Sequence, residues 1–376
     1  MGADMKVLGS NKLLDNIING NLCTGCGACI DLCPYFKSYK GKTVMLFPCT
    51  IPRGKCFAYC PRLEVDLDYM SGKYFGKPYG TDPLGFYQSI LTSKAGWKFT
   101  GNKFQAGGTA SAIMYFALER GYIDGAVLTG REGLLPEPRI VTYPEDVLSC
   151  ALSMYTAAPT ISAVHSAMRK GLSRIGVAST PCQTLSAALM RTNPLEENDF
   201  TDPIDLVVGI FCTWALDFRV FEPFMSSRVD IKTIEKTDIP PPPAEAMEIH
   251  TNEGETLSIP LDEIRTLIPD ACSYCIDMTS EFSDISVGVL EGDPGKNTLI
   301  IRTERGRTIV DEAVREGYLI VDDMPEMNLI HLKHAAGNKK KRALKKAYEA
   351  GMVNNPAEDE ISYLRLHNKT LKEIIG

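Results

Sequence analysis

The stretch Cys23-Thr24-Gly25-Cys26-Gly27-Ala28-Cys29-Ile30-Asp31-Leu32-Cys33-Pro34 contains four cysteines in the pattern C-x2-C-x2-C-x3-C-P. This spacing is typical of iron–sulfur proteins, because three thiolates two residues apart bind one [4Fe–4S] cluster. The fourth cysteine of such a motif ligates the other cluster where two are present. The stretch therefore predicts an electron-transfer site near the N-terminus.

A second, incomplete motif ends in Cys56-Phe57-Ala58-Tyr59-Cys60-Pro61 and repeats the C-x3-C-P ending. Two such endings predict a two-cluster, ferredoxin-like domain. Crossed ligation assigns Cys23, Cys26, Cys29 and Cys60 to the first cluster, and Cys33, Cys49 and Cys56 to the second. A regular copy would have cysteines at positions 50 and 53, where this chain has Thr50 and Arg53. Cys49 can replace one of them, and Cys150 is the only unassigned thiol that could replace the other.

Length and composition indicate a globular protein of two or three domains, with 376 residues, 44% of them hydrophobic and 23% charged. The net charge of −7 makes nucleic acid an unexpected partner. The metal-like spacing of the cysteines points to a reducing compartment. No apolar signal core begins the chain and no apolar run is long enough for a transmembrane segment. We therefore expect a cytoplasmic protein, either free or peripheral to a membrane complex.

Beyond the cysteine motifs the pattern alternates between helices and strands. A helix is expected at Thr109–Arg120, and another at Thr160–Lys170, each with apolar residues at helical spacing. Short strands are expected at 126–128 and 139–142, and buried strands at 174–178 and 206–211. This alternation predicts an α/β domain with a largely parallel sheet.

The expected organisation is a ferredoxin-like 4Fe–4S domain at 1–64, a linker at 65–100, an α/β domain at 101–335 and a helical tail at 336–376. A polyproline kink at Pro240–Pro243 and a hairpin around Asn252-Glu253-Gly254 indicate a small insertion. Six basic residues between Lys339 and Lys346 lie on the expected tail helix. They predict either a solvated face or a docking surface for a partner subunit.

A third group of cysteines lies in the α/β part. Cys182 and Cys212 follow expected strands, where ligands often bind in open α/β sheets, and Cys272-Ser273-Tyr274-Cys275 is a C-x2-C pair. The residues alone leave three interpretations open. The group could form another cluster, Cys272 and Cys275 could be half of a zinc site, or Cys182 and Cys212 could be buried core thiols.

Gly107-Gly108 precedes the expected helix at Thr109–Arg120. A helix N-terminus with glycines suits a phosphate or a flavin edge, and it equally suits a structural turn. No dinucleotide fingerprint, phosphate-binding loop or serine–histidine–aspartate arrangement is evident. His165, on an apolar helix face, is expected to be structural.

From about residue 85 to 330 the chain resembles the coenzyme F420 hydrogenase/dehydrogenase β-subunit family. With its ferredoxin-like front end it is similar to members such as the input subunit of F420H2 dehydrogenase. The matching segments occur in order along the chain: Ala106–Ala112, Gly121–Val127, Tyr155–Pro159, Thr180–Gln183, Gly209–Cys212, Cys272–Cys275 and Phe282–Gly288.

The resemblance implies one FAD in the α/β domain with a [4Fe–4S] cluster beside it. It implies that the cluster ligands are Cys182, Cys212, Cys272 and Cys275. The flavin neighbours it implies are Gly107, Gly108, Thr109, Tyr155, Thr180 and Gln183. F420H2 would deliver a hydride to the flavin, and two or three clusters would carry single electrons onward. The implied partner is a hydrogenase, a formate dehydrogenase, a heterodisulfide-reductase-type complex or a membrane dehydrogenase complex.

The chain departs from the family pattern at three places. A family lysine is absent from Leu152–Tyr155, a Lys-Gly-Lys-Phe segment is replaced near 238–246, and an Asp-Gly-Trp element is replaced near Gly295–Asn297. Such basic and aromatic groups suit an anionic deazaflavin. Two alternatives to F420 therefore stand: the same flavin and clusters serving NAD(P)H or another donor, and a pure electron-transfer adaptor between partner proteins.

Overall fold

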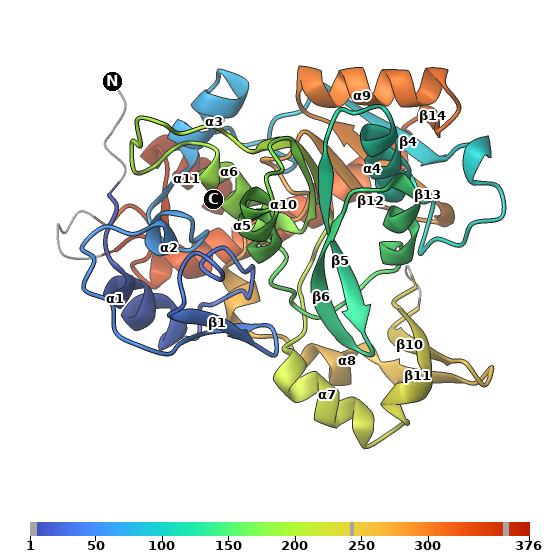
Figure 1. Cartoon of the computed structure of the whole chain (residues 1–376), viewed down its shortest axis with the longest axis horizontal. Coiled ribbons are helices and arrows are strands. Elements are labelled where there is room, and N and C mark those ends of the chain that lie inside the picture. Colours follow the sequence, from blue (N-terminus) through green and yellow to red (C-terminus); the bar gives the residue numbers. More distant parts are fainter. Residues whose placement is uncertain (1–5, 241–243, 356–360) are drawn as a thin grey trace.

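The computed structural model describes residues 6–240, 244–355 and 361–376, and its centre is an eight-stranded sheet (Figure 1). The sheet runs in the order β14-β4-β13-β12-β8-β7-β5-β6. In that order the strands are Leu319–Asp323, Ser89–Ala95, Asp293–Ile301, Ile285–Leu290, Ile204–Ile210, Ile175–Ser179, Gly125–Glu132 and Leu135–Val141.

The middle of the sheet is parallel and its outer strands are antiparallel. Strands β5, β7, β8 and β12 pair in parallel, whereas β6, β13, β4 and β14 join by antiparallel pairing. Short turns with a left-handed glycine connect β5 to β6 at Gly133 and β12 to β13 at Gly292, and such turns can join only antiparallel strands. The α/β class is confirmed, but the expectation of a largely parallel sheet is wrong for the outer strands.

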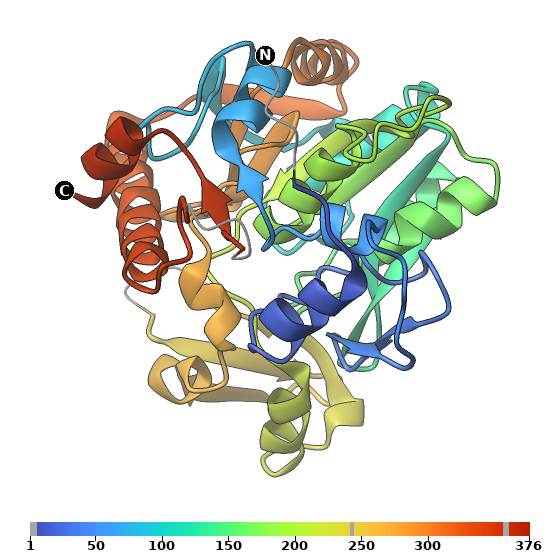
Figure 2. The same ribbon diagram turned by 90° about the vertical axis from the view of Figure 1, so that its left-hand side faces the viewer.

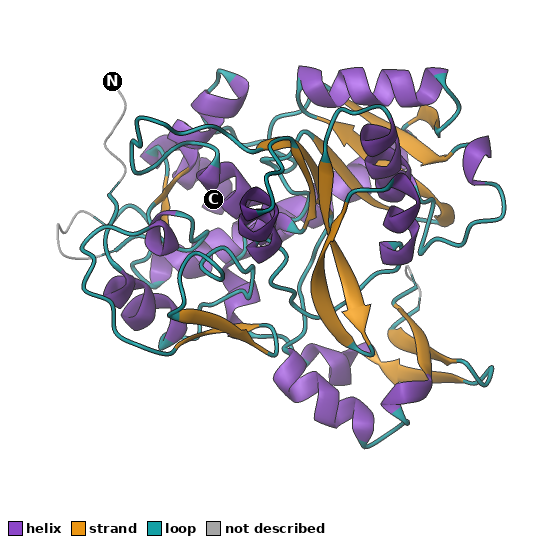
Figure 3. Ribbon diagram, viewed as in Figure 1, coloured by secondary structure: helices purple, strands orange, loops and turns teal. Residues whose placement is uncertain are grey.

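Helices cover both faces of this sheet (Figure 3). Alternate residues of β8 point to opposite faces, so that Val208 packs with α4 (Thr109–Glu119) and α9 (Glu304–Arg315). Val207 packs on the other face with α5 (Ser162–Arg169) and α6 (Pro181–Met190). The two helices expected at 109–120 and 160–170 are therefore present, the first one residue shorter and the second three residues shorter.

The cysteine-rich N-terminal segment packs on the α5 and α6 face, and it lies beside these helices in the view of Figure 2. It contains α1 (Ser10–Leu13), a π-helical turn (Leu14–Ile18), the hairpin β1–β2 and α2. The last three elements span Phe36–Tyr39, Lys42–Met45 and Lys55–Ala58. The buried ring of His165 joins this segment to α5, with its Nε2 2.9 Å from the carbonyl oxygen of Ala28. His165 is thus structural, as expected.

The segment expected to be a linker contributes to the sheet. It contains α3 (Leu67–Phe75), a 3₁₀ turn (Trp97–Phe99) and β4, and β4 lies between β13 and β14. Its first strand, β3 (Val65–Asp66), pairs with β15 (Leu364–Arg365) near the C-terminus. The description of 65–100 as a linker is therefore wrong for β4, and the other domain boundaries remain predictions.

A separate three-stranded sheet forms the insertion, seen below the main sheet in Figure 1. Strands β10 and β11 make the expected hairpin, and β9 joins it antiparallel. With two helices they enclose a small core of their own. The elements, in chain order, are α7 (Phe218–Ser226), a 3₁₀ turn (Ile231–Thr233), β9 (Ile234–Asp238), β10 (Ala246–Thr251), β11 (Thr256–Pro260) and α8 (Leu261–Arg265). Of the predicted polyproline kink, residues 241–243 lie outside the described residues.

The C-terminal part is helical, with α10 (Glu326–Glu349) and α11 (Asn368–Ile375). No helix in the described residues is long and apolar enough to cross a membrane. The basic run on α10 does not form one exposed face, because Lys339 and Lys340 are only 4% and 1% exposed. Both interpretations made from the sequence, a solvated face and a docking surface, are therefore wrong for these two residues.

Lys340 belongs to a buried ion pair. Its Nζ lies 2.9 Å from Oε1 of Glu281, which is itself 2% exposed. The other carboxylate oxygen of Glu281 accepts a hydrogen bond from the hydroxyl of Tyr79 at 2.8 Å. Burial raises the pKa of Glu281, while Lys340 opposes this rise and favours the carboxylate. Removing the lysine alone would leave a buried carboxylate without its counter-charge.

We expect Lys340→Met to lower the free energy of unfolding by about 3–5 kcal/mol at pH 7, measured by denaturant unfolding. Because the pKa of Glu281 is raised in the folded state, the folded protein gains relative stability as the pH falls and the carboxyl is protonated. The loss should therefore be smaller at pH 5. The double variant Lys340→Met/Glu281→Gln should lose clearly less, and an equal loss in both variants would contradict this account.

Candidate iron–sulfur and flavin sites

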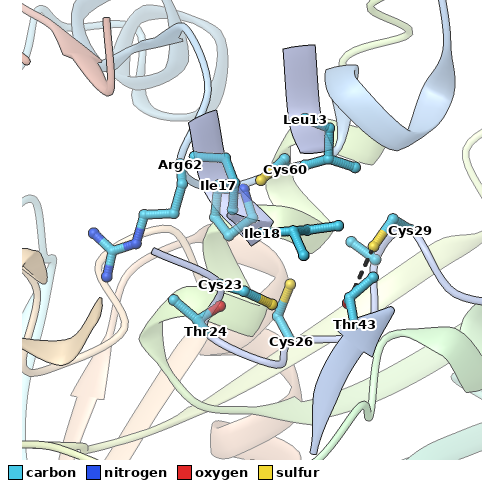
Figure 4. Close-up of a pocket in the computed structure, with 12 residues that line it drawn as sticks. Leu13, Ile17, Ile18, Cys23, Thr24, Cys26, Cys29, Thr43, Cys60 and Arg62 are labelled. Atoms are coloured by element: carbon cyan, nitrogen blue, oxygen red, sulfur yellow. Dashed lines mark hydrogen bonds between the residues drawn. The ribbon is translucent and has the colours of Figure 1, made fainter. Parts of the chain in front are cut away.

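The four cysteines predicted for the first cluster line one pocket (Figure 4). Cys23, Cys26 and Cys29 come from the loop after the π-helical turn, and Cys60 follows α2. Leu13, Ile17 and Ile18 line the same pocket and make it apolar. Three loop cysteines and one distant cysteine thus converge as crossed ligation requires.

Two glycines allow the cysteine loop to pack tightly. Gly25 and Gly27 have φ values of +73° and +88°, in the left-handed region that glycine tolerates without strain. A Cβ atom at Gly25 would collide with the carbonyl oxygen of Gly41, and one at Gly27 with Pro159. The amide of Ile161 donates a 3.1 Å hydrogen bond to the carbonyl oxygen of Cys26. The segment near 157–161 therefore supports this loop.

The chemistry of the first site fits a metal cluster. Burial, followed by the charge of Cys182, raises the pKa of Cys26 to about 12, and burial likewise raises the pKa of Cys29 and Cys60. Crowded thiols in an apolar pocket remain protonated at neutral pH unless a cation replaces their protons. Iron would supply that positive charge, so the donor set suits the [4Fe–4S] cluster expected there.

The second site brings together only three thiols. Burial raises the pKa of Cys56 to about 11, and Cys33 and Cys49 raise it further through their charges, which places the three near one another. Cys150 lies elsewhere. It ends the 3₁₀ helix Pro144–Cys150 and packs on the α4 face of the sheet, opposite the N-terminal segment.

The hypothesis that Cys150 replaces the missing fourth ligand is therefore wrong. The sheet separates it from the other three thiols, a separation that sequence spacing could not reveal. Since every other cysteine belongs to one of the three groups, the second site has no fourth thiol.

The third site gathers four thiols from three segments. Cys182 lies in the first turn of α6, Cys212 follows β8, and Cys272 and Cys275 lie in and just after the 3₁₀ helix η5 (Asp270–Tyr274). Burial raises the pKa of Cys212, Lys339 lowers it, and the other three thiols raise it again. Isolated core thiols would not influence one another in this way.

The spacing of these thiols differs from that of a single-ion site. Within the described residues, no group of three or more His, Cys, Asp or Glu side chains is placed to hold one metal ion. Tetrahedral zinc with Zn–S bonds of ~2.3 Å would require sulfurs about 3.8 Å apart. A four-iron cluster separates its thiolates more widely, because each binds a different iron. The third site suits a cluster better than zinc.

The first and third sites are neighbours. The charge of Cys182 raises the pKa of Cys26, although one lies on α6 and the other in the N-terminal loop. Arg62, two residues after Cys60, donates hydrogen bonds to the carbonyl oxygens of Ala271 at 2.8 Å and Tyr274 at 3.1 Å. One buried guanidinium therefore connects the two cysteine groups. Sequence reasoning missed Arg62, whose only signal was its place after the Cys-Pro pair.

Five of the six residues implied as flavin neighbours lie at the starts of two helices at one edge of the sheet. Gly107, Gly108 and Thr109 begin α4, and Thr180 and Gln183 begin α6. Because α4 leads into β5 and α6 follows β7, both helix N-termini lie at the carboxyl edge of these parallel strands. This is the usual position for a ligand in such a sheet.

These residues also have structural partners within the protein. Thr180 and Gln183 form a capping box, and the Gln183 amide donates to the carbonyl oxygen of Ala158 at 2.8 Å. The Thr109 amide donates to Oδ1 of Asn297 at 3.1 Å. The Tyr155 hydroxyl, on a different segment, accepts a 3.0 Å hydrogen bond from the Ile239 amide. Their role as flavin contacts remains a prediction.

The fold and the cysteine groups define an iron–sulfur protein built on an α/β sheet, and residues 17–35 match the 4Fe–4S binding domain. Residues 94–165 match the N-terminal part, and residues 172–327 the C-terminal part, of the coenzyme F420 hydrogenase/dehydrogenase beta subunit. The chain belongs to the coenzyme F420 hydrogenase/dehydrogenase beta-subunit family, as its ordered sequence segments predicted.

Several relatives are similar over most of the chain. The beta subunit of the coenzyme F420 hydrogenase of Methanothermobacter thermautotrophicus is 27% identical, over 70% of this chain and 94% of that protein. A subunit of the F420H2 dehydrogenase of Methanosarcina mazei is 28% identical, over 84% of this chain and 88% of that protein. The coenzyme F420-dependent sulfite reductase of Methanocaldococcus jannaschii is 28% identical over 85% of this chain, which spans only 50% of that longer protein.

A solved structure has the same fold. One polypeptide of the F420-reducing [NiFe] hydrogenase complex from Methanosarcina barkeri superposes with a TM-score of 0.66 and 26% identity. The match covers 71% of this chain and 93% of the other.

We expect Cys60→Ala to lower the iron content of the anaerobically purified protein by about four irons per chain, because one cubane would lose a ligand. Cys150→Ala is the matched control and should leave the iron content unchanged, since Cys150 lies on the other face of the sheet. Iron and acid-labile sulfide are measured in both variants. Equal iron in Cys60→Ala and the unaltered protein would contradict the assignment of Cys60.

Proposed function

We propose that this chain is a flavin-dependent iron–sulfur oxidoreductase subunit that passes electrons between coenzyme F420 and clusters leading to a partner subunit. The observation that carries this proposal is the placement of two four-thiol sites side by side, with Arg62 between them. Adjacent redox sites suit the transfer of single electrons. Family membership adds the link to F420.

The cysteines would hold the clusters in three sites. Cys23, Cys26, Cys29 and Cys60 would hold the first, and Cys182, Cys212, Cys272 and Cys275 the third. Cys33, Cys49 and Cys56 would hold the second with a non-cysteine group in the fourth position. When bound, such clusters supply one-electron exchange. The chain's own residues fix the order of the sites along the fold and keep water from the first, through Leu13, Ile17 and Ile18.

The flavin belongs to the same proposal. We place FAD at the carboxyl edge of β5 and β7, beside Gly107, Gly108, Thr109, Tyr155, Thr180 and Gln183. When bound, it would supply the exchange between a hydride pair and single electrons. The positive ends of the α4 and α6 helix dipoles would attract and orient its anionic part. Cys182 lies in the first turn of α6, so the third site would be next to the flavin.

The partner subunit would belong to a hydrogenase, a formate dehydrogenase, a heterodisulfide-reductase-type complex or a membrane dehydrogenase complex. We place its contact at the second site. Leu46, Phe47 and Ile51 are exposed apolar side chains on the loop that contains Cys49. The use of cysteine for metal binding fits a reducing cytoplasm.

A second candidate function is a pure electron-transfer adaptor. The observation that favours it is the engagement of Thr109, Tyr155 and Gln183 in hydrogen bonds within the protein. Asn297, at the place of a family aromatic element, caps α4 instead. An adaptor needs no flavin, and a flavin enzyme using NAD(P)H would need no deazaflavin contacts.

We expect the anaerobically purified protein to contain flavin and to be reduced by F420H2 and not by NADH, as followed by the bleaching of flavin and cluster absorbance. Reduction by NADH would favour the alternative donor. Absence of flavin, with reduction only by ferredoxin or a partner subunit, would favour the adaptor. About twelve irons per chain would indicate three cubane clusters, and about eight would mean that the three-thiol site is empty.

A further inference from the structure

Two buried cations flank the third cysteine site. Arg62 is 3% exposed and Lys339 is 4% exposed. The Lys339 ammonium donates to the carbonyl oxygens of Cys212 and Asp277, both at 2.7 Å. The Arg62 guanidinium donates to the carbonyl oxygens of Ala271 and Tyr274, which lie on either side of Cys272 and beside Cys275. Both cations thus contact the loops that present the thiols.

Neither cation has a carboxylate partner in the part of the chain that the structure describes. No ion pair within 4.0 Å involves Arg62 or Lys339 among these residues. The nearby carboxylate of Asp277 accepts hydrogen bonds from the amides of Thr279 and Glu281. By contrast, Lys340, the next residue on the same helix, has Glu281 as its partner at 2.9 Å. Among the described residues Arg302 is also buried without an ion pair, so what distinguishes Arg62 and Lys339 is that both lie against the loops of the four thiols.

A buried charge without a counter-charge is strongly unfavourable. Within the described residues, the hydrogen bonds of Lys339 and Arg62 reach only backbone carbonyl oxygens, which carry no net negative charge. The thiols ionise only when a metal group binds them. The site therefore contains two fixed positive charges whose natural counter-charge is a cluster bound by four thiolates.

The positive charges of Arg62 and Lys339 match the net charge of a [4Fe–4S] cluster bound by four thiolates. Four thiolates contribute four negative charges, and an oxidised [4Fe–4S] core offsets two of them, which leaves a formal charge of about −2. Arg62 and Lys339 supply two positive charges. One added electron makes the cluster more negative, and the two cations stabilise this reduced form more than the oxidised form. They should therefore make the cluster easier to reduce.

Arg62 also borders the first site, and Lys339 does not. Arg62 lines the pocket of Cys23, Cys26, Cys29 and Cys60, and Figure 4 shows its guanidinium directed away from those four sulfurs. Its Nε atom is buried and has no hydrogen-bond partner among the described residues. The guanidinium carbon lies 4.5 Å from the ring centre of Tyr363, which holds the group between the two sites.

We propose that Arg62 and Lys339 are the built-in counter-charges of the site formed by Cys182, Cys212, Cys272 and Cys275, and that they raise its reduction potential. The inference rests on the proposed function in that the site must hold a cluster. Arg62 should raise the potential of the first site as well, because it borders both. The two residues act by positioning and by charge, without contact with a substrate.

The test is a redox titration of the anaerobically purified full chain, followed by electron paramagnetic resonance. Arg62→Gln and Lys339→Met remove the charges, and Arg62→Lys and Lys339→Arg keep them. We expect each charge-removing variant to make reduction of the third-site cluster at least tenfold less favourable, equivalent to about 59 mV for one electron. Arg62→Gln should also lower the first-site potential, and Cys212→Ser identifies which signal belongs to the third site.

The controls separate charge from packing. Lys340→Met/Glu281→Gln removes a buried lysine from the same helix together with its counter-charge, so both potentials should stay unchanged. The charge-keeping variants should retain most of the original potential, whereas a purely structural role would leave potentials unaltered in all variants. Unchanged potentials in Lys339→Met and Arg62→Gln, with full iron content, would overturn the inference.

Failure of the proposed function gives a different result. If the third site holds no cluster, the unaltered protein and Cys212→Ser show the same electron paramagnetic resonance signals. If Arg62→Gln does not accumulate as folded protein, Lys339→Met decides the question alone, since Lys339 lies on a separate helix. If Lys339→Met also fails to fold, Lys339→Gln is titrated in its place, with the same expected loss.

Discussion

The structure depends on a buried guanidinium that joins two parts of the chain far apart in sequence. Arg62 follows the last cysteine of the N-terminal motif and donates to the carbonyl oxygens of Ala271 and Tyr274, about two hundred positions later. A charged donor to backbone oxygens in a dry interior is a strong and directional contact. It brings the loop of Cys272 and Cys275 against the N-terminal cysteine segment, and hence places two cysteine sites side by side.

The sheet supplies the rest of the third site. Cys182 lies where β7 turns into α6, held by the capping box of Thr180 and Gln183, and Cys212 follows the neighbouring strand β8. Because β7 and β8 are parallel, their carboxyl ends meet at one edge. Helix α10 then crosses this region and directs Lys339 at the carbonyl oxygen of Cys212. The sheet edge therefore positions Cys182 and Cys212, and η5 positions the other pair of thiols through its contacts with Arg62.

Sequence reasoning succeeded where spacing alone decides geometry. The local motif Cys23–Cys33 and the repeated Cys-Pro ending predicted which distant cysteine, Cys60, joins the first three. It failed where contacts between segments remote in sequence decide the position of a residue or strand. Cys150 was a possible ligand by elimination, but the strands put it on the opposite face of the sheet. Strand β4 was hidden in a segment rich in glycine and tyrosine, because its pairing with β13 and β14 depends on residues some two hundred positions away.

The sequence by itself indicated the type of chemistry, since four cysteines at C-x2-C-x2-C-x3-C-P spacing are typical of a [4Fe–4S] site. It also determined the α/β class through its alternating apolar periods, and the family through the ordered segments. Only the tertiary structure decided that the first and third sites are neighbours, that the second has three thiols, and that Lys339 and Lys340 face inward with different partners. The physical reason is that charge balance and burial are properties of packed surroundings. Lys340 pairs with a carboxylate, whereas Lys339, the residue before it on the same helix, donates only to backbone carbonyl oxygens within the described residues.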